Sequence, residues 1–170
     1  MKKLAAAILA LIMATALAQA ADDDICAKVA CRERTTVRVR LDPKHYTEVS
    51  FKRMPWTDGD AIYLVTGESF SIQFKATRDA IGAAEYRPGS TPGPDSLELG
   101  LSQQENGFTT LSIKNGFGRR IAYKCVMLLP GDNRMQSTRV LPIEPGLTNF
   151  ESWQHPVAQL ILYDVHYQDK

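Results

Sequence analysis

The chain has 170 residues, 44% of them hydrophobic, and a formal net charge of +1. A chain of this length favours one domain, which buries about 68–70% of its unfolded surface and needs no obligatory cross-links. The balanced charge argues against a nucleic-acid-binding protein, because such proteins present a net basic surface.

The first 20 residues have the pattern of a cleavable secretory signal peptide. Lys2 and Lys3 precede an uncharged apolar run over residues 4–17, and Ala18-Gln19-Ala20 places small residues at the positions that signal peptidase reads. The run has 14 residues, whereas a membrane-spanning helix needs about 20, so an uncleaved anchor is the weaker alternative. No cysteine stands at the cleavage point, which argues against a lipoprotein. We predict export, with the mature chain starting near Ala21.

The mature chain that this cleavage leaves has 150 residues, with 18 basic and 19 acidic side chains. We divide it into a cysteine-containing N-terminal segment, residues 21–34, and a single domain, residues 35–170. No second apolar run reaches spanning length, so no membrane insertion is expected after cleavage. The short basic start and the alanine-rich apolar run are typical of Gram-negative bacteria. They predict the periplasm as the destination, with an extracellular location as the alternative.

The three cysteines, Cys26, Cys31 and Cys125, allow at most one intramolecular disulfide. Proximity favours Cys26–Cys31, whose short loop is worth about 2 kcal/mol in the loop-entropy model. A bond from either residue to Cys125 is the second alternative, and it would close a loop of about 95 residues, worth about 4.7 kcal/mol. The third alternative is no bond. Cys125 shares the apolar face of its predicted strand, where a buried cysteine behaves as a small hydrophobic residue.

After Thr35, apolar and polar residues alternate with the period of two that is typical of β-strands. Residues 36–41 alternate, and residues 47–53 resume the pattern after a turn at Asp42-Pro43-Lys44-His45. Two alternating segments joined by a turn predict a hairpin.

Three elements are expected between this hairpin and the first long loop. Strands are predicted over residues 61–65 and 68–76, and the second alternates apolar and polar residues throughout. Such alternation is typical of a sheet with one buried and one solvated face. Residues 78–85 are compatible with one helical turn.

The longest predicted loop is residues 87–95, which contain three prolines and two glycines. Long loops often carry function, so Arg87 and Ser90 are candidate binding residues. The favoured interpretation is that this segment is a surface loop without a binding role.

The second half of the chain predicts a further series of strands and turns. Asn106-Gly107 and Asn115-Gly116 are Asn-Gly pairs, a strong signal for tight hairpin turns. The nearly all-apolar residues 121–129 predict an interior strand. Strands are expected around residues 97–101, 111–113, 121–129, 137–143 and 157–167.

The last predicted strand carries Asp164 and His166 two residues apart, so that both project from one face. Such a pair has the chemistry of an acid–base or metal site, with His45 as a further member. The favoured interpretation is a solvated outer face. The opposite, buried face is expected to carry Val157, Ile161, Tyr163, Val165 and Tyr167.

About nine short strands with turn residues between them, and no convincing helix, predict an all-β protein. The uneven connections favour an antiparallel, immunoglobulin-like β-sandwich. A small β-barrel is the alternative.

The second half of the chain resembles a family of small, uncharacterised exported proteins of proteobacteria. The resemblance rests on Thr109–Asn115, Ile121-Ala122-Tyr123, Pro142, Gly146, Phe150-Glu151, Trp153, Pro156 and Leu160-Ile161-Leu162. It covers mainly residues 109–165, and it implies export and a β-sandwich but no activity. In that family a cysteine often stands at the position of Leu141, so the family's cysteine pairing does not carry over.

No catalytic residue, metal site or cofactor is predicted. The chain has no Gly-x-Ser-x-Gly nucleophile motif, and its three histidines, His45, His155 and His166, are scattered. A structural zinc site needs four close ligands, and no histidine pair accompanies Cys26 and Cys31.

Two tryptophans are the remaining candidate binding residues. Trp56 precedes a turn at Thr57-Asp58-Gly59-Asp60, and Trp153 lies between Phe150 and Pro156. Tryptophan dominates interface hot spots, so either residue is a candidate anchor for a partner. The favoured alternative for both residues is that the indole ring packs over the open end of the core and has no binding role.

The leading hypothesis is a non-catalytic binding module of the cell envelope, because the sequence predicts a sandwich and has balanced charge and no catalytic constellation. Such a module would meet a protein partner through its end loops or an exposed strand edge. The runner-up is a small periplasmic enzyme or metal-handling protein that uses Asp164 and His166. A subunit of a larger envelope assembly is a third alternative. Fold alone does not separate them, and the oligomeric state stays open.

Overall fold

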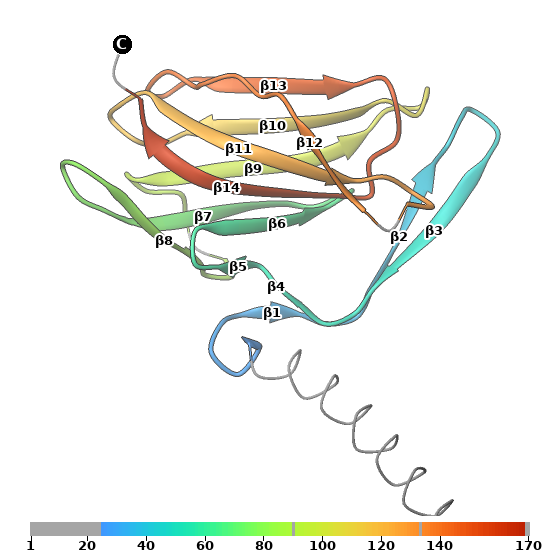
Figure 1. Ribbon diagram of the computed structural model, residues 1–170, viewed down its shortest axis with the longest axis horizontal. Helices are drawn as coiled ribbons and strands as arrows, with labels where there is room; N and C mark the ends of the chain where they lie inside the picture. Colours follow the sequence, from blue (N-terminus) through green and yellow to red (C-terminus); the bar gives the residue numbers. More distant parts are fainter. Residues whose placement is uncertain (1–24, 90, 133, 169–170) are drawn as a thin grey trace, which may run out of the picture.

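The computed structural model describes residues 25–89, 91–132 and 134–168. The predicted signal peptide, residues 1–20, and the candidate binding residue Ser90 lie outside the described residues. Figure 1 shows that the described chain is built almost entirely of β-strands, most of them in two layers that lie one over the other.

All the strand pairings are antiparallel, and they form two five-stranded sheets. One sheet has the order β13-β10-β9-β7-β8, the other has the order β12-β11-β14-β6-β5, and two separate pairs are β2-β3 and β1-β4. Each large sheet ends in two edge strands, so the sheets form an open sandwich and not a closed barrel. The predicted all-β antiparallel sandwich is confirmed. The strands are β1 (Cys31–Arg32), β2 (Thr35–Arg40), β3 (Tyr46–Phe51), β4 (Met54–Pro55), β5 (Thr57–Asp58), β6 (Ala61–Val65), β7 (Ser69–Ala76), β8 (Ile81–Tyr86), β9 (Ser96–Gln103), β10 (Thr109–Asn115), β11 (Ile121–Leu128), β12 (Met135–Thr138), β13 (Thr148–Trp153) and β14 (Gln159–Tyr167).

The main core lies between the two sheets, because the strands alternate buried and solvated residues. In β9, for example, Leu97, Leu99 and Leu101 are buried, while Glu98 between them is partly exposed. Each fully buried aliphatic or aromatic side chain stabilises the fold by about 1.5–3 kcal/mol. The largest fully buried side chains of this core are Phe117, Ile62, Leu64, Ile72, Leu97, Leu101, Leu111, Ile113, Ile121, Leu160 and Leu162.

The predicted hairpin is confirmed as β2 and β3, which we call the hairpin arm. Its apolar face, with Val37, Val39 and Phe51, packs on Val65 and Ala158 in a second, smaller core. Figure 1 shows the arm projecting from one end of the sandwich. The other face of the arm is polar and turned away from this core.

Residues 81–86 form the edge strand β8, so the helical turn expected over residues 78–85 is wrong. β8 pairs with β7, with Ala84 opposite Phe74. The two strands approach so closely at Gly82 that a Cβ there would lie 2.8 Å from the carbonyl oxygen of Lys75. Glycine and alanine have low strand propensity, so the pairing with β7 overrides the local preference.

β14 contains an irregularity at Asp164 that changes which face its residues occupy. Asp164 has a φ of 53°, and the pairing with β11 shifts register beside it. Leu162 is buried before this bulge and Val165 is buried after it. The expectation that Ile161 and Tyr163 share the buried face with Val165 is therefore wrong, because one extra residue reverses the alternation.

Asn115, the last residue of β10, ties two connecting segments together. Its side chain is fully buried. The Oδ1 atom accepts a hydrogen bond from the N–H of Phe117 (2.8 Å), and Nδ2 donates to the carbonyls of Arg119 (2.9 Å) and Ile143 (3.0 Å). One side chain thus satisfies three backbone groups, in the turn after β10 and in the segment before β13.

The favoured disulfide between Cys26 and Cys31 is present, with an S–S distance of 2.04 Å. Cys125 is free and buried, on the inner face of β11 as expected. The second alternative, a bond to Cys125, is therefore not adopted.

Cys125 is expected to resist thiol reagents in the folded protein. Burial, with a smaller effect of the Glu151 carboxylate, raises the pKa of the Cys125 thiol to about 12, and only the thiolate reacts. At pH 8 the native protein should not react with Ellman's reagent, whereas protein unfolded in guanidinium chloride should expose this thiol. Prompt reaction of the native protein would contradict the buried position.

The same pKa difference gives a pH dependence to stability. The unfolded thiol has a pKa of about 8.5, below the folded value. The stabilisation from this group is therefore complete at neutral pH and is lost as the pH rises from about 8.5 towards 12.

Candidate functional site

β8 is the outermost strand of its sheet, and its outer edge lies beside β5 and the turn that follows β5. The backbone N–H of Ala84 donates to the carbonyl of Gly59, in the turn after β5 (N···O 2.9 Å). This bond shows that the backbone of Ala84 faces away from β7, and alternation places the backbone of Tyr86 on the same side. Among the described residues, no hydrogen bond reaches the carbonyl of Ala84 or the amide of Tyr86. Unpaired groups of this kind are a template for a further strand.

The disulfide loop, residues 26–31, faces this edge. The Cys26–Cys31 bond closes the loop, and β1 at its end pairs with β4, where Cys31 lies opposite Pro55. The backbone N–H of Trp56 donates to the carbonyl of Ala30 (3.0 Å). These contacts hold the loop beside a strand that follows it by about 50 residues in the sequence.

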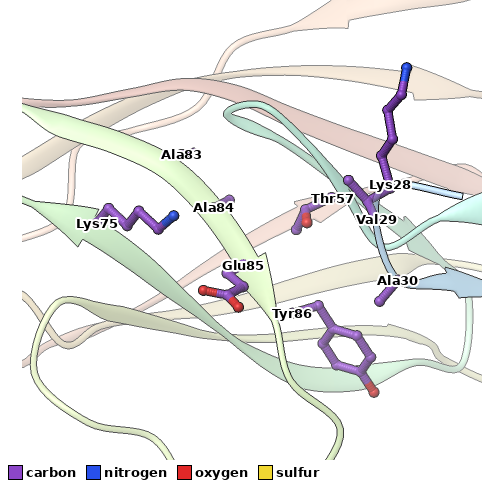
Figure 2. Close-up of a pocket in the computed structure, with 9 residues that line it drawn as sticks. All are labelled: Lys28, Val29, Ala30, Thr57, Lys75, Ala83, Ala84, Glu85 and Tyr86. Carbon is purple, nitrogen blue, oxygen red and sulfur yellow. The ribbon is translucent and has the colours of Figure 1, made fainter. Parts of the chain in front are cut away.

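A groove with a volume of about 320 Å³, which we call the edge groove, lies between the disulfide loop and β8. Figure 2 shows residues 83–86 along one side, residues 28–30 on another, and Thr57 between them. The volume is at the lower end of the range for ligand-binding pockets. It therefore suits a short extended segment. The lining residues are Lys28, Val29, Ala30, Thr57, Lys75, Ala83, Ala84, Glu85 and Tyr86.

Charged groups lie along the β8 side of the groove. Arg87 donates two hydrogen bonds to Glu85, each 3.1 Å long. These bonds, and to a smaller extent the charge of Lys75, lower the pKa of the Glu85 carboxyl, which is therefore ionised at neutral pH. The methyl side chains of Ala83 and Ala84 leave space between the charged groups.

An aromatic cluster stiffens the groove next to Tyr86. The rings of Trp56 and Tyr86 stack with centroids 4.3 Å apart, and Phe70 meets the indole edge-on at 4.9 Å. The guanidinium of Arg32 lies 3.9 Å from the indole centroid. Trp56 is half-buried by these contacts, so it supports Tyr86 as a packed side chain.

Arg32 and Glu68 form a buried ion pair behind this cluster. The Nε atom of Arg32 lies 3.0 Å from Oε1 of Glu68, although its N–H makes no hydrogen bond of standard geometry. Nη2 of Arg32 donates to the carbonyl of Tyr63 (2.8 Å), and Oε2 of Glu68 accepts from the N–H of Val65 (2.8 Å). Burial lowers the pKa of Arg32 and raises the pKa of Glu68, in each case against the attraction between the two charges. Desolvation therefore exceeds the Coulomb gain, as is common for buried pairs.

Two of the predicted binding residues lie beside the edge groove. Trp56 is part of the aromatic cluster, and Arg87 directly follows β8. Trp153 lies in β13, at the opposite edge of the same sheet, where its Nε1 donates to Oγ1 of Thr138 (2.9 Å). Ser90 lies outside the described residues, so the structure brings together only Trp56 and Arg87.

Asp164 and His166 lie together, with Nδ1 of His166 3.5 Å from Oδ1 of Asp164, but His45 does not join them. Asp164 forms an ion pair with Lys124 at 2.8 Å, and Nδ1 of His166 lies 2.8 Å from the backbone carbonyl of Asp164. His45 pairs with Asp42 in the turn of the hairpin arm. The arm packs beside the start of β14, whereas His166 lies near its end. In the described part of the chain, no three His, Cys, Asp or Glu residues form a group that could hold a metal ion.

Sequence reasoning missed the strand side of the groove. Ala83 and Ala84 fall within the helical turn expected over residues 78–85, and they lie in β8 instead. Arg32 gave no sign of burial, since its partner Glu68 lies 36 residues away. The available signal was the pair Cys26 and Cys31, which predicts a rigid loop just before Arg32.

Comparisons with protein-family models, with curated proteins and with solved structures find no match to this chain. Among residues 25–168, apart from residues 90 and 133, no helix is long and apolar enough to cross a membrane.

Proposed function

We propose that the protein is an exported, non-catalytic interaction module of the cell envelope, which binds a protein partner by adding an extended partner segment to β8 in the edge groove. The observation that carries this proposal is the outer edge of β8, where the carbonyl of Ala84 and the amide of Tyr86 form no hydrogen bond among the described residues. In strand addition, main-chain hydrogen bonds supply affinity and pockets for alternate side chains supply specificity.

The groove is held in place before any partner arrives. The disulfide, the bond from Trp56 to Ala30 and the stacking of Trp56 on Tyr86 fix both sides. A rigid site loses little conformational entropy on binding, which favours affinity. Lys75 and the Glu85–Arg87 pair supply charges that would select the partner's side chains.

Two features support export. The first 20 residues have the signal-peptide pattern, and a Cys26–Cys31 disulfide is stable in an oxidising compartment such as the periplasm. An extracellular destination fits the same features.

Photo-crosslinking from position 83 tests this function. A photoreactive amino acid in place of Ala83, which lines the groove, should capture one protein in cells, with the crosslinks confined to one extended segment of it. A synthetic peptide of that segment should bind the purified protein and slow hydrogen exchange at the amide of Tyr86. Crosslinks spread over many proteins would contradict the proposal.

A matched pair of substitutions separates the groove from the rest of the surface. Ala83→Arg should fill the groove and weaken peptide binding by about tenfold or more, which corresponds to about 1.4 kcal/mol. Ser102→Arg places the same side chain on the exposed outer face of β9, away from the groove, and should leave binding unchanged. Equal effects of the two variants would overturn the strand-addition site.

A further inference from the structure

The hairpin arm and the residues at its base carry net positive charge. Residues 35–51, the arm with its turn, contain three basic and two acidic side chains, and Arg34, Lys52 and Arg53 flank it, whereas the rest of the chain after residue 20 contains 12 basic and 17 acidic side chains. The arm also projects from one end of the sandwich (Figure 1). This projection and the arginines of β2 make the arm a candidate surface for anionic ligands.

Two arginines on the polar face of the arm are held by one tyrosine. Arg38 and Arg40 lie two residues apart in β2, and their guanidinium carbons lie 4.0 Å and 4.7 Å from the ring centroid of Tyr46. In the described part of the chain neither arginine forms an ion pair, and Nη1 of Arg40 donates to the carbonyl of Pro43 (3.3 Å). A guanidinium stacked on a ring keeps its N–H edge available, in the planar fork that matches a carboxylate.

A groove with a volume of about 310 Å³, which we call the arginine groove, lies beside this pair. One side carries Arg38, Arg40 and Tyr46, and the other carries Gln104 and Glu105 of the turn after β9. The side chain of Gln103 fixes the position of the arm in this groove through two hydrogen bonds to the backbone of Arg40. Oε1 of Gln103 accepts from the N–H of Arg40 (2.7 Å), and its Nε2 donates to the carbonyl of the same residue (2.8 Å).

The two sides of the arginine groove have complementary chemistry. The arginines provide charged donors for an anionic group, whereas the Glu105 carboxylate and the Gln104 amide accept hydrogen bonds from hydroxyls. A ligand with negative charge throughout would be repelled by Glu105. A sugar acid presents a carboxylate on one side of its ring and hydroxyls on the others.

We propose that the arginine groove binds acidic oligosaccharides built from uronic acid units, with a sugar carboxylate on Arg38 and Arg40 and hydroxyl groups directed to Gln104 and Glu105. This site is separate from the edge groove. It would give the protein a second ligand, of a different chemical class from the partner segment at β8.

Titration of the purified protein with a short oligogalacturonate tests the site. Binding, followed by calorimetry and by amide shifts at residues 38–46 and 103–105, should weaken as salt is added. A neutral cello-oligosaccharide of the same length should not bind. Arg38→Gln and Arg40→Gln should each weaken binding by about tenfold or more, because each removes charge-assisted hydrogen bonds. Arg38→Lys, which keeps the charge and loses the fork, should recover only part of the affinity.

Arg139→Gln is the matched control, since Arg139 is an exposed arginine just after β12, away from the arm. It should leave oligogalacturonate binding unchanged, and all four variants should keep the wild-type melting temperature. Three results would overturn the proposal: no binding to the wild-type protein, equal losses in Arg38→Gln and Arg139→Gln, or equally tight binding of polyphosphate or a poly-glutamate peptide. The last result would show a charged surface without sugar recognition.

Discussion

Asn115→Ala is expected to lower the free energy of unfolding by about 3–5 kcal/mol. The substitution removes the acceptor for the N–H of Phe117 and the donor for the carbonyl of Arg119, while the carbonyl of Ile143 loses one of two donors and keeps the N–H of Ile121 (3.0 Å). Each buried backbone group left without a partner costs about 1–3 kcal/mol. Because Asn115 is fully buried, water cannot replace the lost bonds without opening the fold.

Asn106 provides a matched control for this experiment. Its Oδ1 accepts from the N–H of Phe108 (3.0 Å), the same two-residue pattern that Asn115 makes with Phe117, but Asn106 is exposed. In urea unfolding monitored by circular dichroism, Asn106→Ala should cost about 1 kcal/mol or less, since water satisfies the freed amide. Similar losses of unfolding free energy in the two variants would show that the buried hydrogen bonds of Asn115 stabilise the fold no more than the exposed one of Asn106.

The second large effect is expected at the buried ion pair behind the edge groove. Arg32→Met leaves the Glu68 carboxylate buried without its partner, and Glu68→Gln leaves the Arg32 guanidinium in the same position. Removal of one partner of a fully buried pair costs about 3–5 kcal/mol, and because Glu68 keeps 17% of its side chain exposed, we expect losses towards the lower end of that range. The double variant leaves no unpaired charge, so its loss should be well below the sum of the single losses. Additive losses in urea unfolding would contradict a coupled pair.

The pH dependence of the single variants distinguishes the two partners. Glu68 becomes neutral when protonated, whereas an arginine stays charged at all accessible pH values. Burial already raises the pKa of Glu68, and loss of Arg32 should raise it further. A raised folded pKa gives stabilisation that is present below the unfolded pKa and is lost as the pH rises. The loss of unfolding free energy in Arg32→Met, relative to the wild-type protein, should therefore shrink as the pH falls from 7 to about 4. The corresponding loss in Glu68→Gln should not.

Much of the fold follows from local pattern. The hairpin arm, β7 and β9 alternate strictly, and each was predictable because one face of the strand is buried and the other is solvated. The disulfide followed from proximity of Cys26 and Cys31 in the sequence. Local pattern failed at β8, where glycine and alanine become a strand through pairing with β7. It failed again at Asp164, because a bulge is a property of the pairing with β11 and leaves no mark in composition.

The edge groove was beyond sequence reasoning for a related reason. Its two sides, residues 28–30 and 83–86, are far apart in the chain, and their approach depends on the bond of Ala30 to Trp56 and on the position of β8. Trp56 and Arg87 were identified as candidates from their residue type and loop context. The same reasoning selected Trp153, which lies at the opposite edge of the sheet.

The position of the disulfide loop also bears on how the protein behaves at high concentration. An open strand edge is a risk for aggregation, because each added strand presents a new edge to the next, and fibres grow in this way. At β8 the loop of residues 26–31 stands across the groove. If a partner segment adds to β8 as proposed, the loop would lie on the far side of the added strand and would end the addition after that strand. Such a loop would allow one partner segment to bind while preventing the repeated strand addition that leads to amyloid.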